Sequence, residues 1–403
     1  MTESVITEAT VVTSTGVFDP GWVAVSDGRI AAVGRGPAPR PSERRDGLVI
    51  EAAGRWVVPG FVDLHVHGGE GAQVNGDSPD EVQDAVKRIA RYHARYGTTS
   101  LLATTVSDTP ERLLATVEGV ADFIRVGDPE GARVLGIHLE GPWLARVRMG
   151  AQNPATLREP SVEELQQLLL AGRGLIRLIT IAPELPGAAE VIKAAKAAGV
   201  RVAIGHTDAT FEQAVTAFTL GASHVTHLFN AMSGLHHRHP GAVTAALLHE
   251  EVTLELIADL EHVHPAVLSL VARLAPGRFV AITDAVPAAG LPPGAAFLGA
   301  LDLAVEGHRV VLASDPSTLA GSSLTMDRAL ANLVEVVGLG VPEAVQAAAT
   351  TPAAVIGMHD IGVLRVGAVA DLAFLGDRFV CQATMVGGHI VSGEPAEPPM
   401  AAP

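Results

Sequence analysis

The sequence has few cysteines, few lysines and few aromatic residues, and these shortages limit the classes of protein to which the chain can belong. Its single cysteine, Cys381, rules out an internal disulfide and fits a reducing compartment. A net charge of −16 without a run of lysine or arginine argues against nucleic-acid binding. No signal peptide is visible, and no apolar stretch reaches membrane-spanning length without polar interruption. We therefore expect a cytoplasmic protein with no nucleic-acid or membrane partner.

Eight short apolar segments begin at Phe61, and helix-like segments separate most of them. The apolar segments cover residues 61–68, 98–105, 133–142, 176–181, 200–207, 224–230, 253–258 and 278–284. The clearest helix-like segments cover residues 81–96, 110–125, 161–171, 186–198 and 211–220. Strands that alternate with helices form right-handed βαβ units around a parallel sheet. Eight such units predict an α/β protein with a closed (β/α)8 barrel of the TIM type.

The two ends of the chain differ from the middle, because they consist of short strand-like segments and turns. Asp27-Gly28 is a hairpin signal near the start, and Gly387-Gly388 separates two strand-like segments near the end. We expect residues 1–57 and 360–403 to pair into one small β-sandwich domain. Residues 58–359 would then form the barrel, and a chain of 403 residues with 48% hydrophobic content can bury a core of that size.

Metal-ligating side chains stand at the ends of several predicted strands. His65 and His67 lie two residues apart in a strand, so they project to the same side. An isolated His-x-His is more often a pair of ordinary surface or core histidines, but other strands end in the same way. Their ends carry Glu140, His206, His227 and Asp284. Functional groups of a (β/α)8 barrel gather at these strand ends, so the six residues together predict a metal site.

The residue types suggest which of these residues bind metal and which one transfers a proton. Glu140, His206 and His227 would form a three-ligand site that leaves a position open for water, and neutral imidazoles and carboxylates suit Zn²⁺, Fe²⁺, Mn²⁺ or Co²⁺. His65 and His67 could hold a second metal, with Glu140 between the two. Such a metal lowers the pKa of water and polarises a carbonyl group. Asp284 could take a proton from that water and pass it to a leaving amine. The alternative for Asp284 is a helix N-cap.

Four segments of the chain resemble a known family. They are Pro59 to Gly69, Gly136 to Trp143, Thr226 to Met232 and Val366 to Leu372. The first three look like N-acetylglucosamine-6-phosphate deacetylases of the amidohydrolase superfamily, and the fourth is similar to the closing strand of that superfamily. The resemblance implies metal-dependent hydrolysis of the acetamide of N-acetylglucosamine 6-phosphate to glucosamine 6-phosphate and acetate. It also implies one or two divalent metals per subunit, with zinc the first choice.

The same resemblance implies a substrate-binding set and a homodimer. Asn230 and the backbone amide of Ala231 would meet the phosphate, and His262 would contact the sugar. Arg238 would reach a phosphate in the site of the neighbouring subunit, which is why a homodimer is expected. The remaining positions that the resemblance assigns to the substrate pocket are Ala151, Gln152, Leu319, Ala320 and Gly321.

Three departures from the family pattern bear on the substrate. Gln152 stands where many relatives have histidine, His239 replaces a usual glutamate, and Leu260-Glu261 replaces a usual Gly-Leu. The last two concern the expected sugar and phosphate pocket. A deacetylase for N-acetylgalactosamine 6-phosphate or another acylated amino sugar therefore stays open.

Two more distant alternatives differ in chemistry. A cyclic-amide hydrolase would often bridge its metals with a carbamylated lysine, but the only lysines are Lys87, Lys193 and Lys196, all in helix-like segments. A non-catalytic sugar-phosphate sensor would bind metal and ligand but would not need Asp284.

Overall fold

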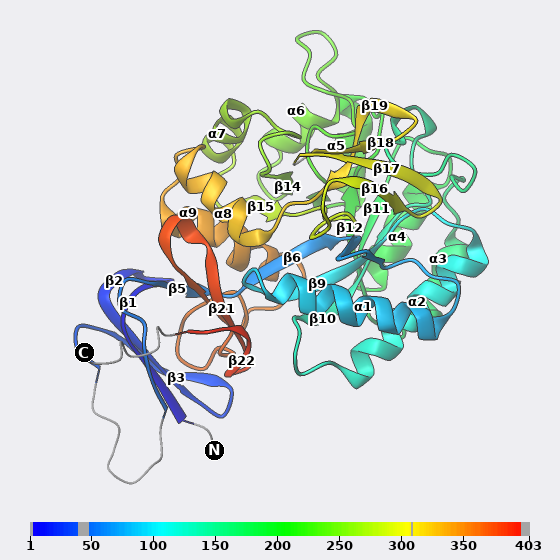
Figure 1. The fold of residues 1–403 in the computed structure, drawn as a ribbon. Coiled ribbons are helices and arrows are strands. Elements are labelled where there is room, and N and C mark those ends of the chain that lie inside the picture. Colours follow the sequence, from blue (N-terminus) through cyan, green and yellow to red (C-terminus); the bar gives the residue numbers. More distant parts are fainter. Residues whose placement is uncertain (1–2, 39–47, 308, 396–403) are drawn as a thin grey trace.

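An eight-stranded parallel sheet closes on itself and forms the main body of the molecule (Figure 1). The computed structural model describes residues 3–38, 48–307 and 309–395. The barrel strands, in sheet order, are β6 (Phe61–Val66), β9 (Thr98–Thr105), β10 (Arg133–Glu140), β11 (Ile176–Ile181), β12 (Arg201–Ile204), β13 (His224–Val225), β14 (Thr253–Ile257) and β15 (Phe279–Ile282). The first and last strands meet where the His67 amide donates to the Ala285 carbonyl oxygen at 2.8 Å and the Asp284 amide to that of His65 at 3.0 Å. The eight predicted strands and the barrel are confirmed.

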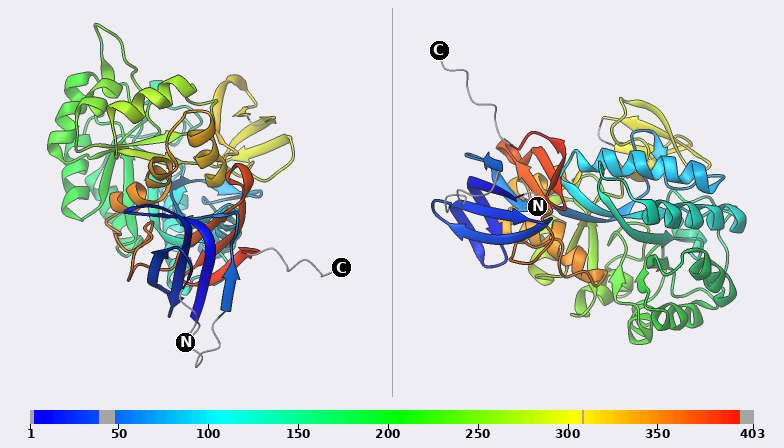
Figure 2. Two further views of the ribbon diagram at one scale, coloured as in Figure 1. Left: turned by 90° about the vertical axis from the view of Figure 1, so that its left-hand side faces the viewer. Right: turned by 90° about the horizontal axis from the view of Figure 1, so that it is seen from below.

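Helices lie outside the barrel strands (Figure 2). The five predicted ones appear as α1 (Pro79–Ala94), α2 (Pro110–Val126), α3 (Val162–Ala171), α4 (Ala188–Ala197) and α5 (Phe211–Leu220). Others are α6 (Gly241–Leu248), α7 (Pro265–Leu274), α8 (Met326–Glu335), α9 (Val341–Val345) and α10 (Thr351–Val355), with a π-helical turn at Gln346–Thr350 and 3₁₀ turns at Arg146–Arg148 and Asp377–Phe379. None of the helices in the described part of the chain has the length and apolar character needed to cross a membrane.

Local sequence explains where the predicted helices begin. The Ser78 hydroxyl accepts a hydrogen bond from the Glu81 amide at 3.4 Å, and Pro79 occupies the first turn of α1. Helix α2 begins in the same way, with Thr109 as the cap and Pro110 in its first turn. A side-chain oxygen at the N-cap satisfies an amide that the helix leaves free, and proline loses nothing at the first position.

The two ends of the chain meet in one continuous sheet beside the barrel (Figure 1). Its strands are β1 (Glu3–Thr13), β2 (Gly16–Ser26), β3 (Arg29–Arg35), β4 (Leu48–Glu51), β5 (Trp56–Pro59), β20 (Leu372–Leu375), β21 (Cys381–Val386) and β22 (His389–Gly393). The sheet has its own apolar core, which includes Ile6, Val23, Val57 and Phe374. The predicted sandwich is thus a single sheet by its hydrogen bonds. Strand β5 pairs with β1 and with β20 and runs across the predicted domain boundary at residue 57. Residues 1–2, 39–47 and 396–403 of the predicted small domain lie outside the described residues.

An ion pair joins this terminal sheet to the barrel. Arg133, at the start of β10, donates to Asp371, which is 1% exposed and also accepts from the Gly387 amide at 2.8 Å. Burial raises the pKa of Asp371, while Arg133 acts in the opposite direction. The Asp371 carboxylate therefore depends on Arg133 to offset the free-energy cost of a buried charge.

Replacing Arg133 with alanine is expected to destabilise the protein by about 1–3 kcal/mol, because it leaves the buried Asp371 carboxylate without its cation. Urea unfolding followed by circular dichroism measures the change. The matched control is Arg125→Ala, which removes a 3.7 Å pair of an exposed arginine with Asp122 and should change stability by no more than about 0.5 kcal/mol. Equal effects of the two substitutions would show that Asp371 does not depend on Arg133.

A small antiparallel sheet, which the sequence did not predict, stands over one side of the barrel mouth (Figure 1). Its strands are β16 (Gly294–Leu298), β17 (Leu301–Glu306), β18 (Arg309–Leu312) and β19 (Asp315–Ser322). A shorter hairpin, β7 (Gly68–Gly69) with β8 (Ala72–Gln73), follows β6. Leu298, Leu303, Val310 and Ala320 pack with Val286 in an apolar core of this sheet. That core fixes β19 beside the strand end that carries Asp284.

Candidate metal centre and active site

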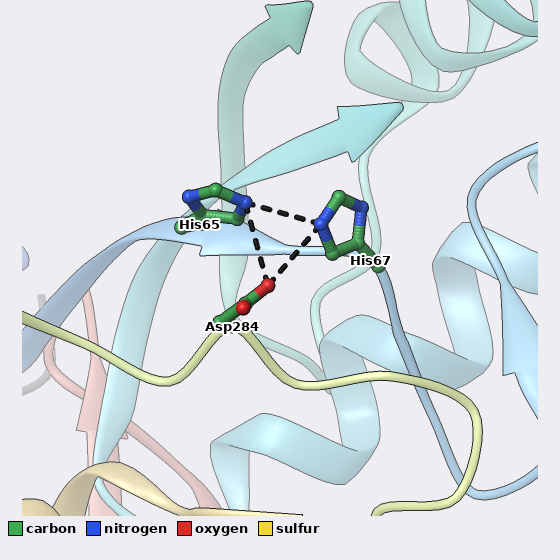
Figure 3. A group of neighbouring side chains, drawn as sticks. All are labelled: His65, His67 and Asp284. Carbon is green, nitrogen blue, oxygen red and sulfur yellow. Dashed lines mark hydrogen bonds and ion pairs between the residues drawn. The ribbon is translucent and has the colours of Figure 1, made fainter. Parts of the chain in front are cut away.

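The side chains of His65, His67 and Asp284 point toward one another at the junction of the first and last barrel strands (Figure 3). The two imidazole Nε2 atoms lie 3.1 Å apart. Asp284 Oδ1 lies 3.4 Å from His65 Nε2 and 3.2 Å from His67 Nε2. All three residues are buried, with Asp284 the most exposed at 7%. These atoms form one group that can hold a metal.

Glu140, His206 and His227 form a second such group next to the first. Glu140 Oε1 lies 3.3 Å from His206 Nε2 and 3.0 Å from His227 Nε2, and the two imidazole nitrogens are 3.1 Å apart. Glu140 also reaches the first group, at 3.4 Å from His65 Nε2 and 3.3 Å from His67 Nε2. The structure thus brings together all six predicted strand-end residues, with Glu140 between the two groups.

Three of these six residues adopt a left-handed backbone conformation. The φ angles are 45° at His206, 26° at His227 and 51° at Asp284. Such a conformation costs a residue with a side chain on the order of 1–3 kcal/mol and is found mainly at functional sites. Each of these residues follows the end of its barrel strand, and its side chain faces a metal group.

The hydrogen bonds around the imidazoles show that the site suits a cation. The Nδ1 atoms of His65, His67 and His206 face a Glu255 oxygen at 3.1 Å and the carbonyl oxygens of Thr104 at 3.2 Å and Arg148 at 2.9 Å. Each Nδ1 must therefore carry the proton, which leaves a lone pair on Nε2. These lone pairs face carboxylate oxygens and one another, so acceptor meets acceptor unless a cation lies between them. The donor set fits a divalent metal bound by imidazole and carboxylate.

The electrostatics of the protein atoms agree. Burial would lower the pKa of His65, but the carboxylates of Glu140 and Asp284 raise it well above its usual range. Burial would raise the pKa of Asp284, but His65 and His67 hold it below its usual value. The pKa of Glu140 lies well below its usual range for the same reason, with His65 and His206 acting against burial. The site therefore favours positive charge among ionised carboxylates.

A cavity of ≈ 370 Å³ opens over these residues, and most of the predicted substrate-binding positions line it. From the metal groups it is lined by His67, Glu140, His206, His227 and Asp284, and from the predicted substrate set by Ala151, Gln152, Asn230, Ala231, His262, Leu319 and Gly321. Ala320 instead faces the apolar core of the β16–β19 sheet. Arg238 does not line this cavity and lies on an exposed loop before α6, with its Nη1 2.7 Å from His237 Nε2.

Two of the lining side chains are held in place by neighbours. Gln152 accepts from the Ser107 amide at 2.7 Å, which directs its own NH₂ group to Glu140 Oε2 at 2.8 Å. The His262 ring is bound through Nδ1 to Asp259 Oδ2 at 2.7 Å. Burial lowers the pKa of His262, but Asp259 raises it above its usual value. Both side chains thus have a fixed orientation in the cavity wall.

Of the departures from the family pattern, Gln152 alone lines the cavity. Glu261 is turned toward β18, where its carboxylate lies 3.6 Å from Arg309 Nε. Leu260 belongs to the wall of a neighbouring cavity, and His239 lies on the same exposed loop as Arg238. These two departures therefore leave the walls of this cavity unchanged.

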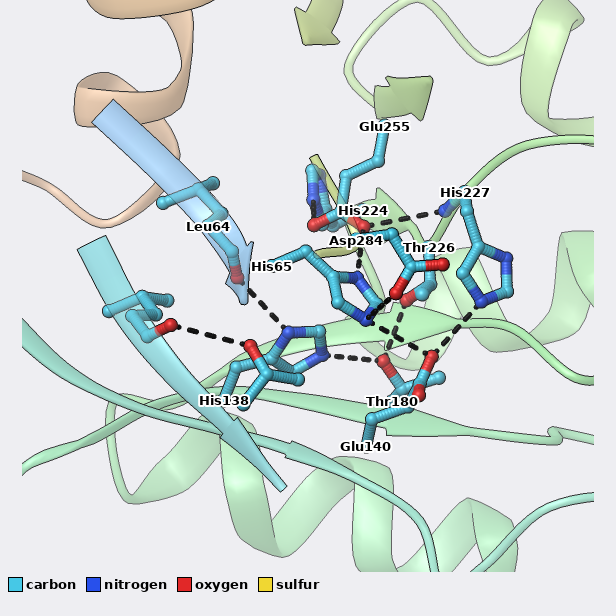
Figure 4. Close-up of polar contacts among 12 residues, drawn as sticks. Leu64, His65, His138, Glu140, Thr180, His224, Thr226, His227, Glu255 and Asp284 are labelled. Atoms are coloured by element: carbon cyan, nitrogen blue, oxygen red, sulfur yellow. Dashed lines mark hydrogen bonds and ion pairs between the residues drawn. The ribbon is translucent and has the colours of Figure 1, made fainter. Parts of the chain in front are cut away.

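A polar layer beneath the metal groups was missed by the sequence analysis (Figure 4). His138 binds the Leu64 carbonyl oxygen at 3.1 Å and Thr180 Oγ1 at 2.7 Å, and Glu255 joins His65 to His224. Asp63 accepts from the Thr283 hydroxyl at 2.6 Å, and burial raises the pKa of Asp63 to about 7 although this bond lowers it. The sequence held a signal for this layer, because residues two apart in a strand point to the same side. Asp63 precedes His65 by two residues, and His138 precedes Glu140 by two.

The three lysines take no part in the site. Lys87 lies in α1, and Lys193 and Lys196 lie in α4, so none stands at a strand end. A carbamylated lysine therefore cannot bridge metals here, and Glu140 is the residue between the two groups.

The chain is similar to known proteins along nearly its whole length. Residues 56–391 match the Amidohydrolase family. The N-acetylgalactosamine-6-phosphate deacetylase of Escherichia coli O157:H7 is 38% identical over 94% of this chain and 97% of the relative. The N-acetylglucosamine-6-phosphate deacetylase of Homo sapiens is 36% identical over 93% of this chain and 89% of the relative.

Among solved structures, an N-acetyl-D-glucosamine-6-phosphate deacetylase from Mycobacterium smegmatis has the same fold. That structure is of an Asp-to-Ala variant in complex with N-acetyl-D-glucosamine 6-phosphate. Its TM-score is 0.89 with 37% sequence identity, covering 97% of this chain and 100% of that one.

Proposed function

The chain belongs to the amidohydrolase family and is an amide hydrolase, and from that premise we propose that it removes the acetyl group of N-acetyl-D-glucosamine 6-phosphate. The products are D-glucosamine 6-phosphate and acetate. One observation carries the proposal, namely the Nε2 lone pairs of His65, His67 and His206, which face carboxylates beside a ≈ 370 Å³ cavity that His67 and His206 line. Relatives named as deacetylases of amino-sugar phosphates support the substrate. The single cysteine supports a cytoplasmic setting for this reaction.

We assign one metal position to Glu140, His206 and His227, and a second position to His65 and His67 with Asp284 and Glu140 beside them. A divalent ion bound there supplies Lewis acidity and lowers the pKa of water to near neutral. Zinc suits this donor set, and iron, manganese or cobalt would also fit it. Gln152 keeps one oxygen of Glu140 directed away from His206 and His227.

Asp284 moves the proton in this proposal. Its pKa lies below the usual value, so it is an ionised base at neutral pH. It takes the proton from the water that attacks the acetamide carbonyl carbon. It then gives the proton to the sugar nitrogen, so that the C–N bond breaks and acetate and a free amine result. The cavity wall at Asp284 is completed by Leu319 and Gly321 of β19.

The remaining cavity residues bind the sugar phosphate. His262, with its Nδ1 on Asp259, presents the other side of its ring to the sugar. Asn230 and the backbone amide of Ala231 meet the phosphate at the cavity edge. Arg238 is exposed in its own subunit, which supports its assignment to the phosphate of a neighbouring subunit's site in a homodimer. A guanidinium group suits phosphate because it offers several donors in a fixed geometry.

A second candidate substrate is N-acetylgalactosamine 6-phosphate. It is favoured by the Escherichia coli O157:H7 relative, which is named as a deacetylase of that sugar phosphate and matches 94% of this chain. The two sugars differ in the orientation of one hydroxyl group, and the acetamide chemistry is the same for both.

Acetate release distinguishes these substrates. Metal-loaded protein is incubated with N-acetylglucosamine 6-phosphate, N-acetylgalactosamine 6-phosphate and unphosphorylated N-acetylglucosamine, and kcat/KM is measured for each. We expect the highest value for the first and little release from the third. A higher value for the second sugar would move the assignment to it, and no release from any would refute the proposed substrate class.

Replacing Arg238 with alanine is expected to raise KM for the phosphorylated sugar roughly 10- to 100-fold, because a charge-assisted hydrogen bond contributes about 1.5–3 kcal/mol. The kcat should change far less, and hydrolysis of the unphosphorylated sugar should stay the same. Arg273→Ala, at another exposed arginine, is the control and should leave KM unchanged.

Mixed dimers test whether Arg238 acts across the interface. Arg238→Ala subunits are unfolded and refolded together with Asp284→Asn subunits. If Arg238 serves the neighbouring site, each mixed dimer has one site with both residues intact, so activity at low substrate rises above that of either variant alone. If Arg238 serves its own subunit's site, the wild-type pair Arg238 and Asp284 never shares a site, and no such gain appears.

A further inference from the structure

We propose that Glu255 is a positioning residue that links the two metal positions from the side away from the cavity. The inference rests on the proposed metal-dependent function but does not depend on which amide is hydrolysed. Glu255 comes from the middle of β14, on the far side of the metal groups from the cavity, and it does not line that cavity. Figure 4 shows it with His65, His224 and His227.

Glu255 makes side-chain contacts with elements of both metal groups. Its Oε2 lies 3.1 Å from His65 Nδ1 and accepts from the His227 backbone amide at 3.3 Å. Its Oε1 lies 2.9 Å from His224 Nε2. Its backbone carbonyl oxygen accepts from the Leu228 amide at 2.8 Å. One carboxylate therefore binds a ligand of the first group and the backbone of a ligand of the second.

Glu255 is fully buried, and no lysine or arginine in the described ranges forms an ion pair with it. A buried carboxylate without a cation is costly unless its oxygens are hydrogen-bonded. Here the carboxylate oxygens are bonded by the imidazoles of His65 and His224 and by the His227 backbone amide. These hydrogen bonds therefore hold Glu255 and its donors in one geometry. Displacement of one donor leaves the carboxylate charge of Glu255 uncompensated.

The contact with His65 sets the tautomer of that imidazole. With Nδ1–H directed to the carboxylate, the Nε2 lone pair faces Glu140, His67 and Asp284. A carboxylate behind a ligating histidine fixes the ring and increases its basicity. Among the ligand histidines of the described ranges, His65 alone has a carboxylate in that position, because His67 and His206 use backbone carbonyl oxygens and His227 Nδ1 has no hydrogen-bond partner there.

The contact with the His227 amide sets the backbone of the second group. His227 has a φ of 26°, which a residue with a side chain adopts only when its surroundings impose it. The Glu255 side chain and its own carbonyl oxygen hold two successive amides of this turn, those of His227 and Leu228. Glu255 thus supports the turn that directs His227 toward Glu140.

Glu255 also lies near His65 and His138 in a third group of possible ligands, but hydrogen bonds account for that group. Both nitrogens of His138 have partners, the Leu64 carbonyl oxygen and the Thr180 hydroxyl. Thr180 continues to Thr226 at 2.6 Å. These bonds make the third group a support for His65 and not a separate metal site.

The test is the metal affinity of the intact protein with Glu255→Gln, measured by competition between purified apo-protein and a chromophoric zinc chelator. We expect both positions to weaken, with about 10- to 100-fold lower affinity at the position of His65 and His67. Glu250→Gln, at an exposed glutamate shortly before β14 begins, is the matched control and should bind zinc like the wild type. Unchanged affinity and stoichiometry in Glu255→Gln would overturn the proposal.

A double substitution separates coupling from simple loosening of the barrel. In a His65→Gln background, the imidazole that Glu255 contacts in the first metal group is gone. Adding Glu255→Gln should then change zinc affinity only at the Glu140, His206 and His227 position. If the effects of the two substitutions on zinc affinity add fully at both metal positions, Glu255 does not act through His65.

Nitrogen NMR of the wild-type protein tests the proposal without a substitution at Glu255. In protein labelled with ¹⁵N-histidine and loaded with zinc, the His65 ring is expected to carry its proton on Nδ1, with the signal assigned by its absence in His65→Gln. Protonation of Nε2 instead would refute the proposed role of Glu255. Because both readouts concern metal and protons, failure of the substrate assignment would leave them unaffected.

Discussion

Replacing Asp284 with asparagine is expected to lower kcat for acetamide hydrolysis by about 10²- to 10⁴-fold, the usual contribution of a general acid–base group. The asparagine amide has nearly the same shape but cannot accept and return a proton. Zinc at Glu140, His206 and His227 should be retained, because Asp284 does not belong to that group. Steady-state kinetics and metal analysis of the same preparation measure both quantities.

Asp302→Asn provides the matched control, since Asp302 is an exposed residue of β17. It should leave kcat unchanged. An unchanged rate in Asp284→Asn would remove this residue from the mechanism. A wild-type protein that binds metal and sugar phosphate without turnover, and whose binding is the same in Asp284→Asn, would instead favour the sensor alternative.

Removal of the metal is expected to abolish hydrolysis, because the three Nε2 lone pairs and the carboxylates then face one another without a cation. The apo-protein should also unfold at a lower temperature. A ligand at 1,000 times its dissociation constant stabilises the folded state by about 4 kcal/mol. Dialysis against a chelator, followed by acetate release and thermal unfolding, measures both changes.

Stepwise return of zinc should restore activity and stability together, and the number of equivalents needed gives the metal count. His224→Gln is a useful comparison, because His224 touches Glu255 but belongs to neither metal group at the cavity. Full activity in protein shown by elemental analysis to hold no metal would exclude the proposed mechanism.

The barrel could be predicted because its strands are buried on both sides. All six residues of β6 and all eight of β9 are buried, so these strands appear in the sequence as short segments of mainly apolar and small uncharged residues between helical ones. The end of each segment then marks the functional face, which is how His65, Glu140 and His227 could be identified. Boundaries of the helices agreed closely because Ser78 and Thr109 are local caps.

Other features depend on contacts between distant segments and leave only weak local signals. The β16–β19 sheet begins with exposed residues, and its apolar core comes from packing against Val286. Glu255 is one carboxylate in an apolar strand, and its role follows from His65 and His227, which lie 190 and 28 residues away in the chain. The left-handed conformations of His206, His227 and Asp284 are likewise imposed by surrounding structure.

The sequence by itself determined the barrel, the identity of the six strand-end residues and the class of chemistry they support. Those follow from side-chain periodicity and from the ligand properties of imidazole and carboxylate, which are local. Only the tertiary structure decided that Gln152 is bound to Glu140 and that Glu261 faces away from the cavity. Such arrangements depend on how the strands close into a barrel, because closure sets which side chains meet across it.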